Sequence, residues 1–259
     1  MDSGNSLDLF LDSVSRAEKR ALMLDYDGTL APFVVERDRA YPYPGVREAV
    51  DAIMEQGRSR VVVVSGRAVK DLMPLMGFSR TPEVWGSHGW ERLGPDGVVT
   101  VPETGEIERA GIEAAVKWAG GSGHPGRAEV KPSGVAFHTR GLEDARASRL
   151  RDEAKSVFDG IASRGGFDVR GFDGGVELRL SGMDKGDTVR ELLAELGPGA
   201  AAAYLGDDDT DEDAFRALSG NGLGVLVRLE PRESAASLWI RPPGELLLFL
   251  DRWRAACGR

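Results

Sequence analysis

The fold is decided by the stretch Arg20-Ala21-Leu22-Met23-Leu24-Asp25-Tyr26-Asp27-Gly28-Thr29-Leu30. Its first five residues form a short apolar run, which is typical of a buried strand in a parallel sheet. Asp25 and Asp27 follow one residue apart, and two such acids repel each other unless a cation lies between them or one stays protonated. Gly28 lets the backbone turn sharply. The stretch therefore fits either a metal or proton-transfer site or a strand that ends in an ordinary Asp-Gly turn.

A second strand end carries small polar groups. The β-branched run Arg60-Val61-Val62-Val63-Val64 favours a strand, and Ser65-Gly66-Arg67 follows it directly. Residues 68–76 fit a helix whose free N–H groups would point at an anion held beside Ser65. The alternative is that Ser65 only caps this helix.

Two later segments add a lysine and a dense group of acids. Lys185 begins a predicted helix that runs to about Leu196. Its charge opposes the helix dipole there, which is unfavourable unless an anion is bound nearby. The alternative is that the side chain is simply solvated. The run from Ala200 to Leu205 predicts another strand, and Gly206-Asp207-Asp208-Asp209-Thr210-Asp211-Glu212 follows it. These acids fit either the solvated start of a helix or a Mg²⁺ site.

The order of these segments predicts the architecture. Strand-like and helix-like segments alternate before Trp85 and again after Lys185, which indicates right-handed βαβ units and a parallel sheet. Polar residues that follow such strands meet at one edge of the sheet. We predict an α/β fold with a Rossmann-like parallel-sheet core formed by residues 1–102 and 183–259. A smaller α/β domain is inserted at residues 103–182.

The inserted domain has a different pattern of predicted strands and helices. A hairpin with a turn at Gly94-Pro95-Asp96-Gly97 leads into it. The sequence predicts helices at residues 107–119 and 142–162, with a glycine-rich break at residues 120–126. Alternating polar and apolar residues predict antiparallel strands with one polar face at residues 128–131, 135–139 and 176–180.

Composition excludes several classes of protein. Hydrophobic residues make up 41% and charged residues 29% of the 259 residues, which is ordinary for a folded protein. The net charge of −9 would repel nucleic acids and anionic membranes, so we expect a small-molecule partner. No apolar run approaches the roughly 20 residues of a membrane span, and residues 7–14 fit an amphipathic helix rather than a signal sequence. With its single cysteine, Cys257, the chain is expected to be cytoplasmic.

Several motifs resemble those of a known family. In chain order, the four segments resemble the four motifs of haloacid dehalogenase-type phosphatases, a superfamily of hydrolases. A narrower resemblance, to the trehalose-6-phosphate phosphatases, covers nearly the whole chain. It rests on Asp25 to Pro32, Ser65-Gly66-Arg67, Gly86-Ser87-His88-Gly89-Trp90-Glu91, Glu129-Val130-Lys131, Phe137-His138-Thr139-Arg140, Val176-Glu177-Leu178-Arg179 and Gly206 to Phe215.

This resemblance implies an activity. The chain would be a Mg²⁺-dependent phosphatase that hydrolyses trehalose 6-phosphate to trehalose and phosphate through an aspartyl-phosphate intermediate. The inserted domain would be a cap that closes over the core and selects the leaving group, excluding bulk water. A functional pairing with a sugar-phosphate synthase is a further prediction.

The resemblance also implies roles for single residues. Asp25 would be the nucleophile, and Asp27 would first protonate the leaving sugar oxygen and then activate water. Mg²⁺ would be held by Asp25, the backbone carbonyl of Asp27 and Asp207, while Asp208 and Asp211 would orient water and metal. The phosphoryl oxygens would be bound by Ser65, Gly66, Arg67 and Lys185.

Contacts to the sugar are implied for a second group of residues. Their side chains can make charge-assisted hydrogen bonds to hydroxyl groups: His88, Glu129, Lys131, Arg140 and Glu177. For the charged residues on strands the alternative is a solvent-exposed face, and for His88 it is a buried structural role. Arg140 lies two residues after His138 on the same predicted strand, so we expect both side chains to point the same way.

Other functions are compatible with the same motifs. The core motifs do not distinguish one sugar from another, so the substrate could instead be sucrose phosphate, glucosylglycerol phosphate or mannosylglycerate phosphate. A non-catalytic sugar-phosphate sensor is a different class. A protein that only binds has no need of both acids, so four intact residues argue against a sensor: Asp25, Asp27, Lys185 and Asp207. A phosphotransferase would pass the phosphoryl group to another acceptor and release no free phosphate.

Overall fold

The computed structural model describes residues 3–172 and 174–259, and their contacts divide the chain into two compact units. The first unit consists of Met1–Thr100 and Asp184–Arg259, and the second of Val101–Met183. Their roles as catalytic core and cap stay predictions. Among the described residues, no helix combines the length and the apolar character that crossing a membrane requires.

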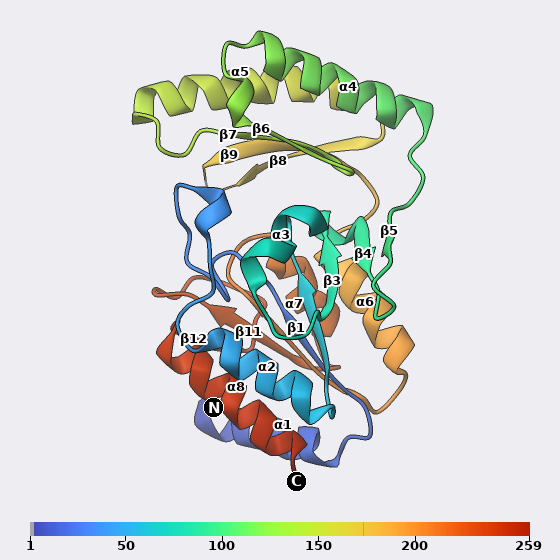
Figure 1. The fold of residues 1–259 in the computed structure, drawn as a ribbon, viewed down its shortest axis with the longest axis vertical. Helices are drawn as coiled ribbons and strands as arrows, with labels where there is room; N and C mark the ends of the chain where they lie inside the picture. The colour runs from blue at the N-terminus through green and yellow to red at the C-terminus, as the bar shows by residue number, and fades with distance from the viewer. Residues whose placement is uncertain (1–2, 173) are drawn as a thin grey trace. The chain divides into compact units, whose positions relative to one another are not determined.

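One twisted sheet forms the centre of the first unit (Figure 1). Its strands are β1 (Arg20–Leu24), β2 (Arg60–Val64), β3 (Glu83–Gly86), β4 (Glu91–Leu93), β5 (Val99–Thr100), β10 (Ala201–Gly206), β11 (Leu223–Val227) and β12 (Leu238–Ile240). Their order in the sheet is β12-β11-β10-β1-β2-β3-β4-β5. Pairing is parallel from β12 to β3 and antiparallel at the β3-β4-β5 edge. The predicted α/β class, with its parallel core sheet and edge hairpin, is confirmed.

Helices cover both faces of this sheet. They are α1 (Ser3–Arg16), α2 (Val46–Gln56), α3 (Val69–Met76), α6 (Lys185–Leu196), α7 (Asp211–Leu218) and α8 (Gly244–Cys257), with short 3-10 turns η1 (Arg37–Arg39) and η2 (Ser87–Gly89). Because side chains alternate along a strand, Leu22 and Leu24 pack with α1, α2, α3 and α8, while Ala21 and Met23 pack with α6 and α7. Figure 1 shows α1, α2 and α8 together on one side. Each fully buried leucine contributes about 1.5–3 kcal/mol to stability.

The second unit is an antiparallel sheet with helices on one face (Figure 1). Its elements are α4 (Glu106–Gly121), η3 (Pro125–Arg127), β6 (Ala128–Lys131), β7 (Gly134–His138), α5 (Asp144–Ala162), β8 (Phe167–Phe172) and β9 (Gly175–Leu180), with strand order β6-β7-β9-β8. Strand β8 was not predicted from the sequence. This edge strand buries only Phe167 and therefore has no apolar run to reveal it. The predicted glycine-rich break also begins too early, because α4 continues through Gly121.

The parallel strands of the first unit bring the predicted polar segments to one edge. β1 pairs with both β2 and β10, so the residues that follow these three strands are neighbours. The N–H of Asp25 donates to the carbonyl of Leu205 at 2.8 Å, and the N–H of Ser65 donates to that of Trp85 at 2.8 Å. The carboxyl edge of the sheet therefore collects the acids and the hydroxyl, as expected for an open α/β sheet.

Replacing Phe158 by alanine should destabilise the second unit. Phe158 on α5 is fully buried, and its ring centre lies 5.7 Å from that of Trp118. Its truncation leaves a cavity and should lower the free energy of unfolding by about 3–5 kcal/mol, measured by urea unfolding. Val116→Ala on α4 is the control, because Val116 is 38% exposed and its truncation should cost less than about 0.5 kcal/mol. Equal losses in the two variants would contradict the packing.

Candidate active site

A buried lysine joins two acidic segments of the first unit. Lys185, the first residue of α6, places its Nζ 2.7 Å from Oδ1 of Asp25 and 2.8 Å from Oδ1 of Asp211. Burial alone would lower the pKa of Lys185, but the charges of Asp211 and Asp25 outweigh it and raise that pKa well above its usual value. Lys185 is therefore a paired cation rather than a solvated one.

Asp211 organises the loop that follows β10. Its Oδ1 accepts hydrogen bonds from Lys185 and from the hydroxyl of Tyr204, the latter at 2.6 Å. Its Oδ2 accepts the backbone N–H groups of Asp207 and Asp208 at 2.9 and 3.0 Å. Since a carboxylate has about four lone-pair sites, these bonds use its acceptor capacity. Asp211 therefore holds the loop in shape through its side chain.

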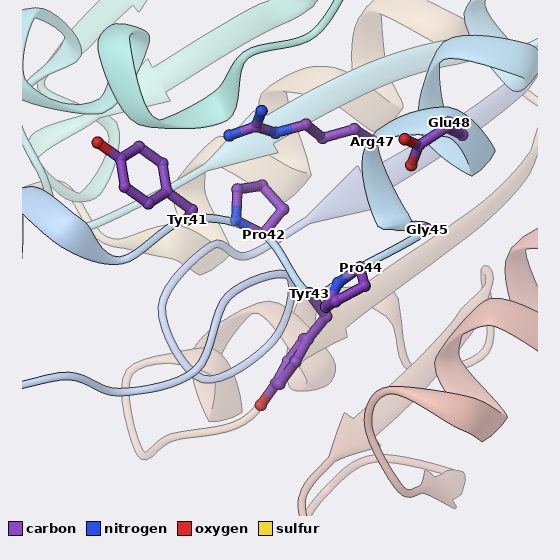
Figure 2. Close-up of a pocket in the computed structure, with 7 residues that line it drawn as sticks. All are labelled: Tyr41, Pro42, Tyr43, Pro44, Gly45, Arg47 and Glu48. Atoms are coloured by element: carbon purple, nitrogen blue, oxygen red, sulfur yellow. The ribbon is translucent and has the colours of Figure 1, made fainter.

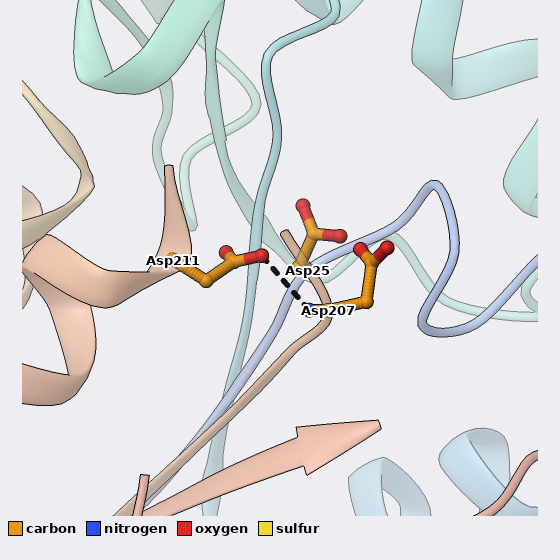
Figure 3. Close-up of side chains that lie close together, drawn as sticks. All are labelled: Asp25, Asp207 and Asp211. Atoms are coloured by element: carbon orange, nitrogen blue, oxygen red, sulfur yellow. Dashed lines mark hydrogen bonds between the residues drawn. The ribbon is translucent and has the colours of Figure 1, made fainter. Parts of the chain in front are cut away.

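The carboxylates of Asp25, Asp207 and Asp211 form a buried group that fits a metal ion (Figure 3). Each offers an oxygen, and these oxygens lie within 4.8 Å of one another. Oδ1 of Asp207 is buried and has no hydrogen-bond partner in the described part of the chain. Burial, together with repulsion from the neighbouring acids, raises the pKa of Asp25 and Asp207 well above the usual range despite the opposing charge of Lys185. A hard divalent cation would satisfy the orphaned oxygen and keep both acids ionised.

Asp208 turns back on its own loop. Its Oδ1 accepts the N–H and the hydroxyl of Thr210 at 2.8 and 2.6 Å. Burial would raise the pKa of Asp208, but the charge of Lys185 and the bonds from Thr210 lower it on balance. Asp208 is thus an ionised residue that shapes the turn into α7.

Asp27 is held in a bidentate ion pair. Nε of Arg67 lies 2.5 Å from Oδ2 of Asp27, and Nη2 lies 2.6 Å from Oδ1. The remaining Nη1 donates to the carbonyl of Arg37 at 2.9 Å. The structure thus brings Arg67 against Asp27, a contact that the sequence did not predict. A contact between Arg67 and phosphate stays a prediction.

The segment after β2 is fixed by close backbone contacts. Oγ of Ser65 accepts the N–H of Arg67 at 3.1 Å, and the carbonyl of Ser65 accepts the N–H of His88 at 2.9 Å. The N-cap of α3 is Ala68, so Ser65 does not cap that helix. At Gly66, a Cβ atom would lie 2.7 Å from the imidazole ring of His88. His88, which is 7% exposed, therefore packs directly on the backbone at the end of β2.

Gly28 lets two loops approach each other closely. Its φ is +86°, and a Cβ atom there would lie 2.2–2.6 Å from the carboxylate atoms of Asp207. Its N–H donates to the carbonyl of Ala31 at 2.7 Å and closes a turn. The Asp-Gly turn, one of the two alternatives from the sequence, is therefore present, and it lies against the carboxylate of Asp207.

A hollow of about 430 Å³ lies elsewhere on the first unit (Figure 2), and it is lined by Tyr41, Pro42, Tyr43, Pro44, Gly45, Arg47 and Glu48. Figure 2 shows the ring of Tyr43 pointing away from Tyr41 and Arg47. Burial, and then the negative charge of Asp207, raise the pKa of Tyr43. The hollow holds none of the clustered carboxylates, so we place the candidate active site at the acids and not in the hollow.

A compact group of charges occupies one face of the second unit's sheet. Nζ of Lys131 lies 2.6 Å from Oε1 of Glu177 and 3.9 Å from Oε2 of Glu129, and Nε2 of His138 lies 3.0 Å from the same oxygen of Glu129. Glu129, Lys131 and Glu177 are only 8%, 7% and 5% exposed. They are therefore not the solvent-exposed face that alternation along the strands allowed.

The prediction that Arg140 continues the strand of His138 is wrong. β7 ends at His138, and Arg140 lies in the turn that follows. The N–H groups of Thr139 and Arg140 both donate to the carbonyl of Gly174, at 2.6 and 3.2 Å. This shared acceptor breaks the regular pairing with β9, so strand alternation does not orient Arg140.

Three residues around the acids were not predicted: Tyr204, Arg228 and Arg232. Tyr204 is the one large polar residue in the run Ala200 to Leu205, a local signal that could have revealed it. Nη1 of Arg228 donates to the carbonyl of Asp207 at 2.9 Å, and Nη2 of Arg232 donates to that of Asp208 at 2.7 Å. A bond to a backbone carbonyl requires no particular residue type in the partner, so these two arginines left no pattern in the sequence.

The sequence matches a family of known proteins. The family model for trehalose-phosphatase matches residues 23–238. A relative from Oryza sativa subsp. japonica named "Probable trehalose-phosphate phosphatase 9" is 30% identical over 279 residues, which cover 93% of this chain and 71% of the relative.

Solved structures share the fold. The C-terminal domain of C. albicans trehalose-6-phosphate phosphatase matches with a TM-score of 0.80 and 20% identity, covering 98% of this chain and 97% of that one. A haloacid dehalogenase-like hydrolase from B. subtilis matches with a TM-score of 0.61 and 14% identity, covering 90% and 98% of the two chains. These similarities concern the fold alone, whereas the family model matches most of the sequence. The chain therefore belongs to the trehalose-phosphatase family, and it is a phosphatase that hydrolyses phosphoric monoesters.

Proposed function

We propose that this phosphatase hydrolyses trehalose 6-phosphate to trehalose and phosphate, with Mg²⁺ bound and with an aspartyl-phosphate formed on Asp25. The observation that carries the proposal is the setting of Asp25. Its carboxylate is buried at the end of the central strand, 2.7 Å from Lys185 and beside an acid with a partnerless oxygen. The name of the relative supports the substrate.

Asp25 acts as the nucleophile. Its carboxylate oxygen forms a bond to phosphorus while the bond between phosphorus and the sugar oxygen breaks. The ammonium group of Lys185 offsets the negative charge that would otherwise keep a phosphate dianion away from Asp25. Asp211 fixes this ammonium group from the other side, at 2.8 Å.

Asp27 acts first as an acid and then as a base. In the first step its protonated form gives a proton to the leaving sugar oxygen. In the second step its carboxylate takes a proton from the water that attacks the aspartyl-phosphate, which releases phosphate and restores Asp25. The two bonds from Arg67 orient the Asp27 carboxylate. When Asp27 gives or takes up a proton, one of its oxygens therefore has to break or share its hydrogen bond to the guanidinium group.

The residues that would hold Mg²⁺ are Asp25, Asp207 and the backbone carbonyl of Asp27. The partnerless oxygen of Asp207 and the excess of carboxylates over the single ammonium support this assignment. When bound, the ion neutralises charge on the phosphoryl group and on the two acids. Asp208 and Asp211 orient this set through the loop backbone.

Phosphoryl oxygens are bound by groups at the end of β2 and by Lys185. The Oγ of Ser65 accepts one hydrogen bond from the chain, which leaves its hydroxyl proton for a ligand. Gly66 lets its backbone approach closely, and Arg67 adds positive charge.

The sugar is recognised by the charged residues of the second unit and by His88. Glu129, Lys131 and Glu177 are buried and oriented by ion pairs, and such groups make charge-assisted hydrogen bonds to hydroxyls. Arg140 contributes a further donor. We also propose a sugar-phosphate synthase as the supplier of the substrate, and the cytoplasm as the location.

Free-phosphate release from a panel of sugar phosphates tests the substrate. We expect a kcat/KM for trehalose 6-phosphate at least about tenfold above those for sucrose 6-phosphate, glucosylglycerol phosphate and glucose 6-phosphate, because a wrong sugar leaves buried polar groups unpaired. A preference for another sugar phosphate of the panel would leave the phosphatase activity in place and change the proposed substrate. No release from any member would favour the sensor.

Replacing Asp25 by asparagine should reduce phosphate release at least about a thousandfold, because the amide cannot form the aspartyl-phosphate. The matched control is Asp251→Asn on α8, whose side chain is 64% exposed and which should keep nearly full activity. Circular dichroism checks that both variants fold. Native turnover by Asp25→Asn would rule out this nucleophile.

Removing divalent metal with EDTA should abolish phosphate release, and added Mg²⁺ should restore it. Without the ion, the buried acids around Asp25 repel one another and the incoming phosphate. The assay follows phosphate release before and after dialysis against EDTA, with circular dichroism as the check on folding. Full turnover by metal-free protein would refute the proposed metal dependence.

A further inference from the structure

The acidic loop, defined here as residues 206–210, is held from two opposite sides. On one side, Oδ2 of Asp211 accepts the N–H groups of Asp207 and Asp208. On the other side, Arg228 and Arg232 donate to the carbonyls of the same two residues, at 2.9 and 2.7 Å. The N–H and C=O groups of two successive residues are thus fixed by charged side chains that lie outside the loop.

Arg228 reaches the loop from a rigid position. It directly follows β11, and its N–H donates to the carbonyl of Ile240 at 3.0 Å. Its own carbonyl accepts the indole N–H of Trp239 at 3.0 Å. Because both backbone groups of Arg228 are bound to β12, its guanidinium group is presented from the sheet and not from a free loop.

Arg232 is anchored by an acid of α7. Its Nη1 lies 2.7 Å from Oε1 of Glu212. Glu212 also accepts the hydroxyl of Ser234 and the N–H of Ala235, both at 2.7 Å. Burial opposes the ionisation of Glu212, but these bonds and the arginine lower its pKa on balance. The guanidinium group of Arg232 is thereby fixed between α7 and the carbonyl of Asp208.

Arg228 and Arg232 also bring positive charge to a loop whose carboxylates repel one another. The loop and the first turn of α7 concentrate carboxylates, which repel one another and oppose the loop's compact shape. A guanidinium group stays charged at any physiological pH, and it can therefore offset this repulsion permanently. Donation to carbonyl oxygens leaves the carboxylate of Asp207 available, and its Oδ1 has no hydrogen-bond partner among the residues that the structure describes.

We propose that Arg228 and Arg232 are positioning residues for metal binding, which hold the acidic loop so that Asp207 faces Asp25 before the ion arrives. Their guanidinium groups contact the loop through the carbonyls of Asp207 and Asp208. The inference rests on the proposed metal site, and it adds two residues to that site that lie beyond the acids themselves.

Metal affinity measured by calorimetry, with Mg²⁺ as the titrant and no substrate present, tests the inference. Arg228→Met and Arg232→Met should each weaken Mg²⁺ binding by about 10- to 100-fold, as expected for residues that orient a metal ligand. Arg228→Lys keeps a cation that can reach the carbonyl, and it should recover at least half of that loss on a logarithmic scale. The control is Arg109→Met in the second unit, because Arg109 donates to the carbonyl of Thr104 at 2.8 Å and its loss should leave the affinity unchanged.

A second readout separates positioning from a general structural role. At saturating Mg²⁺ the Arg232→Met variant should regain a kcat within about threefold of the parent, because excess ion compensates weaker binding by mass action. A merely unstable variant would lose activity at every Mg²⁺ concentration. If Arg228→Met does not fold, Arg232→Met alone decides the matter by the same two measurements.

The outcomes distinguish this inference from the proposed function. If the parent protein binds no Mg²⁺, the proposed metal site fails and the arginines have nothing to position. If the parent binds Mg²⁺ and both methionine variants bind it equally well, the inference is overturned while the metal site stands. Weaker binding that excess Mg²⁺ does not rescue would also overturn it.

Discussion

The buried ammonium group of Lys185, set between Asp25 and Asp211, is the interaction on which the rest of the structure depends. Moving a charge out of water costs several kcal/mol, and only close opposite charges offset that cost. Here two carboxylates at 2.7 and 2.8 Å do so. This arrangement ties the first residue of α6 to the end of β1 and to the start of α7. Removing one partner would leave a buried charge uncompensated, at a cost of about 3–5 kcal/mol.

The same cluster is left with an excess of negative charge. One lysine neutralises one carboxylate in net terms, whereas three are gathered within 4.8 Å. Burial, and then the charges of the neighbouring acids, raise the pKa of Asp25 and Asp207 well above the usual range. Arg228 and Arg232 donate to carbonyl oxygens and not to the carboxylate of Asp207. They therefore do not pair with the excess carboxylate. A cation bound beside Asp207 would balance this excess of charge.

The two units solve the problem of buried charge differently. In the first, parallel strands bring acids together at one edge, and backbone N–H groups, a lysine and arginines hold them. In the second, opposite charges on β6 and β9 meet across the intervening strand β7, as Lys131 does with Glu177.

The sequence by itself determined the strands and helices that carry the acids, because their signals are local. Apolar runs of five residues placed Asp25 and Ser65 directly after β1 and β2, and residues 185–196 form the predicted helix. Tertiary structure alone decided which side chains meet. Arg67 pairs with Asp27, a residue far from it in the chain. Arg228 and Arg232 likewise bond to an acidic loop that lies some distance before them. The burial of Glu129 also depends on the folded structure. Such contacts depend on how strands are ordered in a sheet and on where a backbone carbonyl points, and neither leaves a mark in a short stretch of sequence.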